Sequence, residues 1–214
     1  MTPTPPQLSR RHAFGVTAAL GLGAGLSALP QLTEIAAAMP PIPEPGIPDR
    51  KVLRYTYQRQ ATQNWCAAAS GRIALSAKGK TPTQNSLRKQ MGIGPEGSHG
   101  LQEPREIAWT LNARLGLGGK SFRYRLYIPA AGTLKERLRY RTRISIHNGY
   151  PVVINMNSVA GEPYSAGHYI AIVGYDKTRY KIADPDAPSR NGVWYHQNDI
   201  VDWNKRNRFT AFGT

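Results

Sequence analysis

The order of hydrophobic patterns along the chain restricts its fold more than any other feature of the sequence. After residue 50, most segments with apolar residues at helical spacing come first, and most short runs typical of β-strands follow them. We predict helices over residues 64–77, 81–90, 104–115 and 133–147, and strands over residues 52–57, 122–127, 150–156, 168–175, 179–184 and 192–196. This order is typical of an α+β fold with an antiparallel sheet. We therefore expect one α+β domain over residues 51–214, long enough to bury a core without covalent staples.

The cysteine content narrows the chemistry that this domain can support. Cys66 is the single cysteine of the 214 residues, so the chain can form neither an internal disulfide nor a cysteine-rich zinc module. No two of the five histidines stand at the spacing of metal ligands. The sequence therefore predicts no metal site and no cofactor. The one thiol is either an inert side chain packed in the core or a reactive group.

The first 38 residues are typical of an export signal. Arg10 and Arg11 precede an uncharged run over residues 13–29, and Ala38 ends an Ala-rich cleavage site. The glycines of the run make it a poor membrane span. The paired arginines resemble signals of the twin-arginine route, which carries folded proteins across bacterial cytoplasmic membranes. We expect contact with the twin-arginine translocation machinery, cleavage before Met39 and a secreted or cell-envelope-associated product; an uncleaved N-terminal anchor is the alternative.

A proline-rich linker is predicted between this signal and the domain. Residues 39–50 contain five prolines, which favour an extended polyproline conformation with little to bury. We therefore expect the folded domain to start near Lys51.

Positive charge is concentrated in one part of the predicted domain, which we call the basic segment (residues 120–143). The whole chain carries a formal net charge of +15, and the cations of this segment face a single acid, Glu136. They are Lys120, Arg123, Arg125, Lys135, Arg137, Arg139, Arg141 and Arg143. A solvated face of a helix and a strand is the simpler interpretation, and contact with an anionic cell wall or polysaccharide is the functional one. No motif of a specific nucleic-acid-binding module accompanies the charge.

The chemistry is best sought around Cys66. Asn64 is predicted to cap the N-terminus of a helix, which places Cys66 in the first turn. The positive end of the helix dipole favours a thiolate there. His168 is the histidine that stands at a predicted strand start with small neighbours, and Gly167 leaves space beside its ring. Asp184 is placed to orient the second nitrogen of this base.

The spacing of His168 and Asp184 agrees with such a pair. If strands 168–174 and 179–184 form a hairpin that turns at Asp176, the two residues lie opposite each other, with Cβ atoms ~5 Å apart. A shift of the turn by one or two residues would make them diagonal neighbours, which are still within reach.

These residues resemble the papain-fold cysteine peptidases, and within them the group related to the bacteriocin-processing, double-glycine-leader peptidases. The similar motifs are Gln60, Asn64-Trp65-Cys66 at the start of an Ala-rich helix, Gly167-His168-Tyr169, Val173-Gly174-Tyr175-Asp176 and Ala183-Asp184-Pro185. The resemblance covers about residues 51–204. It implies a papain-like fold in which the helix of the nucleophile packs on a C-terminal antiparallel sheet.

The resemblance also implies a role for each residue of the site. Cys66 is the nucleophile, His168 the general base and acid, and Asp184 the residue that orients the imidazole. Gln60 would hold the oxyanion together with the backbone N–H of Cys66. Gln58 and Gln63 also lie near the thiol in the sequence, so the assignment to Gln60 rests on its spacing from Cys66.

The predicted function follows from this resemblance. We expect an exported cysteine peptidase or amidohydrolase that cleaves a peptide or amide bond of a peptide or protein substrate through a thioester acyl-enzyme. One alternative is an acyltransferase, of the transpeptidase or transglutaminase-like kind, that uses the same Cys-His-Asp site. The other is a catalytically silent basic binding module on the same fold.

Overall fold

The structure of the protein is a computed structural model that describes residues 46–214. The predicted export signal, its cleavage site and residues 39–45 of the predicted linker lie outside the described residues. The described residues form five α-helices and a seven-stranded antiparallel sheet. The helices are α1 (Cys66–Ser76), α2 (Gln84–Gln90), α3 (Arg105–Leu115), α4 (Leu134–His147) and α5 (Gln197–Trp203). The strands are β1 (Lys51–Val52), β2 (Arg123–Tyr127), β3 (Val152–Val159), β4 (Glu162–Tyr175), β5 (Arg179–Ala183), β6 (Asn191–His196) and β7 (Phe209–Gly213).

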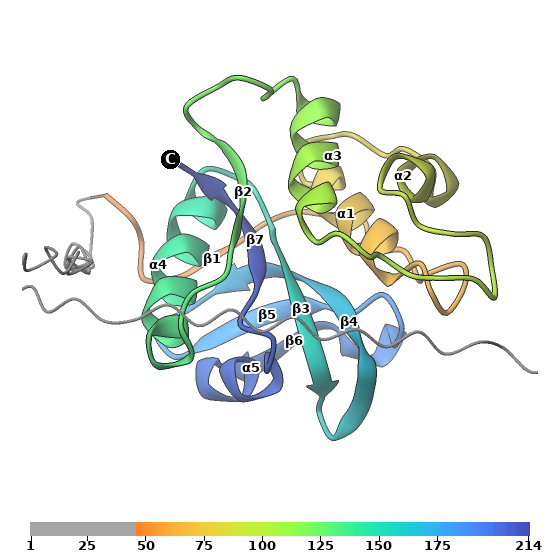
Figure 1. The fold of residues 1–214 in the computed structure, drawn as a ribbon. Helices are drawn as coiled ribbons and strands as arrows, with labels where there is room; N and C mark the ends of the chain where they lie inside the picture. The colour runs from red at the N-terminus through yellow and green to blue at the C-terminus, as the bar shows by residue number, and fades with distance from the viewer. Residues whose placement is uncertain (1–45) are drawn as a thin grey trace, which may run out of the picture. The chain divides into compact units, whose positions relative to one another are not determined.

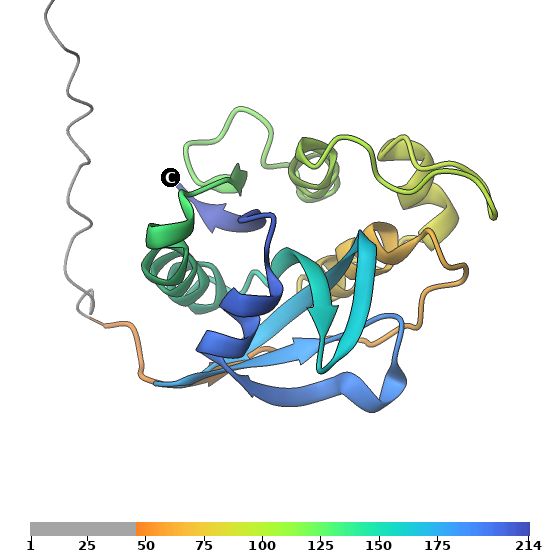
Figure 2. The same cartoon turned by 60° about the horizontal axis from the view of Figure 1, so that its bottom comes forward.

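The sheet collects strands from both halves of the domain. Its strand order is β2-β7-β3-β4-β5-β6, and β1 pairs with the end of β4. Figures 1 and 2 show α1, α2 and α3 gathered together, apart from α4 and α5. The predicted α+β architecture, with helices mostly preceding an antiparallel sheet, is confirmed.

Strand β4 is covered on both faces, which explains its unbroken apolar run. Ile170 and Ile172 pack in one cluster with Leu138 of α4. The alternate residues Ala171 and Val173 pack in another cluster with Ile73 of α1. A strand that is buried on both faces needs apolar residues at every position rather than at every second one.

Helix α1 approaches β4 closely because its side chains are small. Ala67 and Ala68 are fully buried, and the Ser70 hydroxyl donates a hydrogen bond of 2.8 Å to the carbonyl of Tyr169 on β4. These contacts hold the first turn of α1, and therefore Cys66, near β4.

The first predicted strand is shorter than expected. Pairing with β4 is limited to Lys51 and Val52, and one more hydrogen bond of 2.9 Å joins the Leu53 amide to the Val173 carbonyl. Beyond this point β3 occupies that edge of β4, because β3 pairs with β4 up to Ile172. The following residues have no free strand edge, although alternate side chains still face the core.

Two elements near the C-terminal end of the sequence were not predicted. Residues 197–203 form α5, and residues 209–213 form β7, which lies between β2 and β3. All five residues of β7 are buried, so the strand lacks the alternation that marks a half-buried strand.

The described end of the predicted linker is held against the domain. The hydroxyl of Tyr175 donates to the carbonyl of Pro48 at 2.9 Å. Arg143 on α4, which is 4% exposed, donates to the carbonyl of Ile47 at 3.3 Å and pairs with Asp49 at 3.8 Å. Contacts with the domain therefore begin a few residues before Lys51.

Candidate active site

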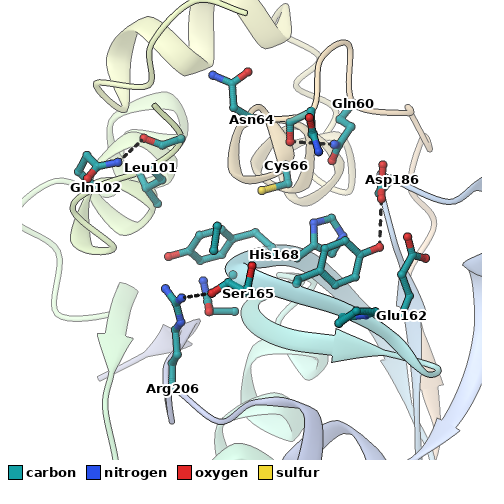
Figure 3. Close-up of a pocket in the computed structure, with 18 of the residues that line it drawn as sticks. Gln60, Asn64, Cys66, Leu101, Gln102, Glu162, Ser165, His168, Asp186 and Arg206 are labelled. Carbon is teal, nitrogen blue, oxygen red and sulfur yellow. Dashed lines mark hydrogen bonds between the residues drawn. The ribbon is translucent and has the colours of Figure 1, made fainter. Parts of the chain in front are cut away.

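A cleft of about 1100 Å³ lies between the segment that enters α1, the loop that precedes α3 and the first part of β4. Gln60, Cys66 and His168, three of the four predicted site residues, line this cleft (Figure 3). The fourth, Asp184, is 0% exposed and is hydrogen-bonded to His168. The fold therefore brings together all four side chains that the sequence analysis selected.

Cys66 lies in the first turn of α1, as predicted, and is its first residue, but Asn64 does not cap the helix. Trp65 holds the N-cap position and makes no side-chain hydrogen bond there. The Asn64 Oδ1, the atom that a cap would use, accepts from the Thr62 hydroxyl at 2.8 Å, and the amide donates to the carbonyls of Pro95 at 2.9 Å and His99 at 3.1 Å. Asn64 thus anchors a wall of the cleft, and the first amides of α1 remain available to a negative charge near Cys66.

His168 and Asp184 meet as diagonal neighbours on adjacent strands. Ala171 pairs with Ala183, and continuing this register by one residue places Asp184 opposite Ile170. Asp184 is therefore offset by two residues from His168, which is the diagonal arrangement rather than the directly opposed one. The two side chains are joined by a hydrogen bond of 2.6 Å between His168 Nε2 and Asp184 Oδ1.

The surroundings of His168 favour its charged form. The ring is 2% exposed and stacks on Tyr164, with ring centroids 4.2 Å apart and planes tilted by 19°. Burial lowers the pKa of His168, but hydrogen bonds with Asp184 and Cys66 outweigh burial and raise this pKa to about 9. An imidazolium is therefore stable beside Cys66 at neutral pH.

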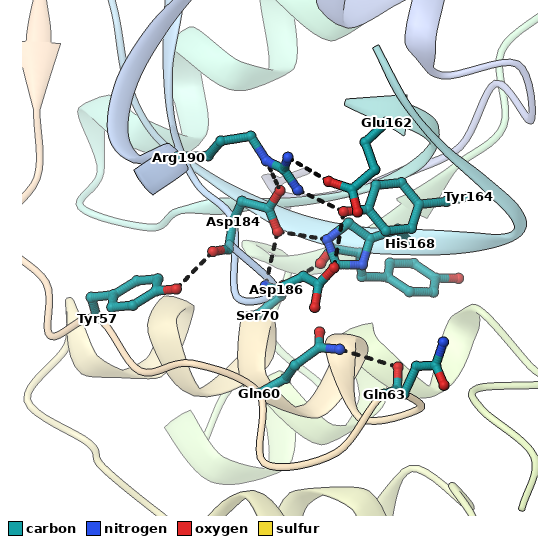
Figure 4. Close-up of polar contacts among 11 residues, drawn as sticks. Tyr57, Gln60, Gln63, Ser70, Glu162, Tyr164, His168, Asp184, Asp186 and Arg190 are labelled. Atoms are coloured by element: carbon teal, nitrogen blue, oxygen red, sulfur yellow. Dashed lines mark hydrogen bonds and ion pairs between the residues drawn. The ribbon is translucent and has the colours of Figure 1, made fainter. Parts of the chain in front are cut away.

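Asp184 belongs to a buried network of charges (Figure 4). Its Oδ2 accepts a hydrogen bond of 2.6 Å from Arg190 Nε, and Arg190 also contacts Glu162 at 2.7 Å and the Tyr164 hydroxyl at 2.6 Å. The amide of Asp186 donates to Asp184 Oδ1 at 3.0 Å. Burial raises the pKa of Asp184, but the hydrogen bonds from the imidazole, this amide and the guanidinium outweigh burial and lower it below its ordinary value.

Gln60 is the glutamine that is positioned to serve the cleft. Its Nε2 donates to the carbonyl of Gln63 at 3.1 Å, and since an amide nitrogen carries two hydrogens, one remains to face a substrate. The Gln60 backbone N–H donates to the carbonyl of Pro185 at 2.8 Å, which ties this segment to the residue after Asp184. Gln58 is instead paired with Gln84 at 2.9 Å and does not line the cleft.

Gly167 leaves space in the structure, but at a different position from the one expected beside the His168 ring. Its φ of +89° lies in the left-handed region that favours glycine. A Cβ at this position would lie 3.1 Å from Arg206 Nη1 and 3.2 Å from Asn155 Oδ1. The missing side chain therefore leaves space beside Arg206 and Asn155, rather than beside the imidazole.

Sequence reasoning missed three residues that hold the site in place. Arg190 neutralises Asp184, Tyr164 stacks on His168, and Gln84 fastens the segment before α1 by bonding to the carbonyl of Arg59 at 2.7 Å and the amide of Ala61 at 2.9 Å. None of these residues stands in a motif. The sequence carried no signal for them, because each acts through a contact that depends on how separate segments pack.

The basic segment lies outside the cleft, since none of its residues lines it. Its cations are also not equivalent. Arg143 is buried, whereas Arg141 lies over the Tyr127 ring, with its guanidinium carbon 4.8 Å from the centroid. The exposed part of this charge is therefore smaller than the sequence count indicates.

Within residues 46–214, no group of three or more His, Cys, Asp and Glu side chains is arranged to hold a metal ion. None of the helices in the same range combines the length and the apolar composition that crossing a lipid bilayer requires.

Comparison with known proteins gives a family and several related folds. The profile described as the Peptidase_C39 like family matches residues 52–213. A C39-like peptidase structure from Bacillus anthracis shares 13% identity, with a TM-score of 0.55, and the match covers 78% of this chain and 98% of that one. The peptidase domain of Streptococcus ComA, a bifunctional ABC transporter in a quorum-sensing pathway, shares 16% identity, with a TM-score of 0.50 and coverages of 75% and 98%. A double-glycine-motif protease from an AMS/PCAT transporter, solved with a leader peptide, shares 15% identity, with a TM-score of 0.50 and coverages of 75% and 92%. No curated protein matches the sequence significantly.

Proposed function

The chain belongs to the Peptidase_C39 like family, and from this premise we propose that it is a cysteine peptidase that cleaves a peptide or amide bond through a thioester on Cys66. The resemblance seen in the sequence is thereby confirmed at the level of family and fold. One observation carries the proposed mechanism. Buried Asp184 is hydrogen-bonded to His168, and His168 lines the same cleft as Cys66 and Gln60.

In the proposed reaction His168 takes the proton of the Cys66 thiol, and the thiolate attacks the carbonyl carbon of the scissile bond. The second N–H of the Gln60 amide and the backbone N–H of Cys66 stabilise the negative oxygen. The imidazolium then gives its proton to the leaving amine as the C–N bond breaks, which leaves a thioester. Water, deprotonated by His168, attacks this thioester, and the acid product leaves as the thiol regains its proton.

Asp184 keeps the imidazole oriented and stabilises its positive charge through both steps. Because Arg190 and the Asp186 amide occupy its other lone pairs, its Oδ1 stays directed at His168 Nε2. The elevated pKa of His168, about 9, supports an imidazolium that is available as the general acid near neutral pH.

The test of this proposal is the Cys66→Ala variant, assayed on a mixed peptide pool by mass spectrometry. Turnover should disappear while the melting temperature stays nearly the same, because Cys66 is only partly buried. A fully active variant would overturn the proposal. Adding a competing amine distinguishes transfer from hydrolysis, because hydrolysis leaves a free acid and transfer leaves an amide. Labelling of Cys66 by an electrophile at mildly acidic pH would argue against a silent binding module.

We further propose that the enzyme is exported by the twin-arginine route and lodges outside the cytoplasm, where the basic segment contacts an anionic cell wall or polysaccharide. The paired Arg10 and Arg11 and the net charge of +15 support this proposal. Cell fractionation with N-terminal sequencing tests it. Replacement of both arginines by lysine should hold the full-length chain in the cytoplasm, and unchanged export would reject the route.

A further inference from the structure

Two arginines of the cleft have no acidic partner. Arg206 and Arg208 both line the cleft, on the loop between α5 and β7. Within residues 46–214 neither side chain forms an ion pair with a carboxylate. Glu96 on the facing loop also lines the cleft, but it pairs with neither guanidinium. Two neighbouring cations in a cleft are favourable when a ligand supplies the missing negative charge.

The loop that carries these arginines is built around a buried side chain. Asn204 is 0% exposed, its amide donates to the carbonyl of Arg208, and its Oδ1 accepts from the Arg208 backbone N–H, both at 3.3 Å. Asn207 adopts a φ of +49°, which closes the turn in a conformation that asparagine tolerates. The backbone of Arg208 is therefore held in place before any substrate arrives, which lowers the cost of binding.

The position of Arg206 is also restricted, and it lies next to an unsatisfied acceptor. Its Nη2 donates to the carbonyl of Ser165 at 3.0 Å, and its Nη1 lies at the space that Gly167 leaves open. Asn155 borders the same space. It is 2% exposed, and its Oδ1 has no hydrogen-bond partner among the described residues. A buried acceptor without a partner is costly, so a substrate N–H that reaches Asn155 would bind favourably.

The charges of the cleft are arranged asymmetrically about the nucleophile. Figure 3 shows Arg206 on one side of Cys66 and His168, and Glu162 and Asp186 on the other. The acids of the second side are already engaged, since Glu162 pairs with Arg190 and Asp186 accepts from the Tyr164 hydroxyl at 3.0 Å. On the side of Arg206, by contrast, no carboxylate of the described residues pairs with the positive charge.

We propose that Arg206 and Arg208 bind a carboxylate of the substrate on one side of the scissile bond, so that the enzyme selects acidic peptides. This inference rests on the proposed peptidase function. The planar guanidinium fork matches a carboxylate in geometry, and Asn155 Oδ1 accepts an N–H of the same peptide. The carboxylate belongs either to an internal Glu or Asp side chain or to the free C-terminus of the peptide.

The experiment compares peptide sets that differ only by Glu or Gln at each position around the cleaved bond. Wild type should show a kcat/KM that is roughly 10- to 100-fold higher for Glu at one position, on one side of the bond, as expected for a charged hydrogen bond. Arg206→Gln and Arg208→Gln should each lose most of this preference. Lys205→Gln is the matched control, because Lys205 directly precedes Arg206 on the same loop, is exposed and does not line the cleft. Amidated and free C-termini, compared on the same peptides, distinguish the two sources of the carboxylate.

The outcomes separate this inference from the proposed function. Cleavage at equal rates of all Glu and Gln peptides with free and with amidated C-termini would reject the carboxylate site and leave the peptidase intact. If wild type cleaves no peptide, the proposed function fails, and binding of the same fluorescent peptides to the protein then tests the site alone. Equal affinities for all of these peptides would reject it. Should Arg208→Gln fold poorly, Arg208→Glu offers a second test, because it should move the preference from Glu toward Lys at that position.

Discussion

Replacing Arg190 by Gln should reveal how strongly the buried network holds Asp184. The variant keeps a polar side chain but removes the cation that lies 2.6 Å from a carboxylate with no solvent exposure. With the two charge centres ~4 Å apart and an effective dielectric constant of about 20, their attraction is about 4 kcal/mol.

The loss of stability also depends on the other contacts of Arg190 and Asp184. Glu162 is half exposed, so its pairing with Arg190 adds at most about 1 kcal/mol. The imidazole of His168 remains as a partner and recovers part of the loss. Because breaking a buried ion pair costs about 3–5 kcal/mol, we expect the free energy of unfolding to fall by about 3 kcal/mol.

The assay is urea unfolding at pH 7, followed by tryptophan fluorescence, with kcat/KM measured in parallel. Arg179→Gln is the matched control, because Arg179 contacts Asp176 at a similar 2.7 Å but is 46% exposed. We expect the control to lose less than about 1 kcal/mol. Equal losses in the two variants would refute the reasoning, since they would show that burial of Asp184 adds nothing to the value of the pair.

Gln60→Ala should lower kcat by roughly 100- to 1000-fold, because it removes the proposed donor to the oxyanion. Gln63→Ala should change kcat only a few-fold, because its backbone carbonyl remains; equal effects of the two substitutions in single-turnover assays would contradict this assignment. The pKa of His168, about 9, lies above its unfolded value, so its stabilising contribution is complete below about pH 6.5 and is lost as the pH rises through about 9. The free energy of unfolding and kcat/KM, measured from about pH 6 to 10, should both decline toward the alkaline end. Asp184→Asn should move the decline in activity to lower pH; a profile that Asp184→Asn leaves unchanged would show that Asp184 does not set this pKa.

The parts of the site that could be predicted from the sequence depend on short stretches of chain. Cys66 was placed in the first turn of a helix because the Ala-rich run that follows it is helical in pattern. His168 and Asp184 were paired because a hairpin brings residues a few positions apart on either side of a turn into contact. The exact register of β4 against β5 could not be predicted, because a bulge between Ile172 and Gly174 inserts an extra residue in β4.

The role of Asn64 shows why local preference can mislead. The sequence predicts an N-cap, and the intrinsic preference of asparagine for that position is real. The carbonyls of Pro95 and His99, about thirty residues away, take the side chain instead. A cap hydrogen bond is worth about 1 kcal/mol, and these two bonds together with the one from the Thr62 hydroxyl to Asn64 Oδ1 are enough to override it.

The sequence by itself determined the α+β order, the helix that presents Cys66 and the hairpin that joins His168 to Asp184, because helix and hairpin geometry follow from residue spacing alone. Only the tertiary structure decided that β7 enters the sheet between β2 and β3, that Arg190 neutralises Asp184, and that Arg206 and Arg208 face the cleft. These contacts join segments that are separated by loops or by whole elements. Their geometry is set by the packing of the core as a whole, which no local pattern encodes.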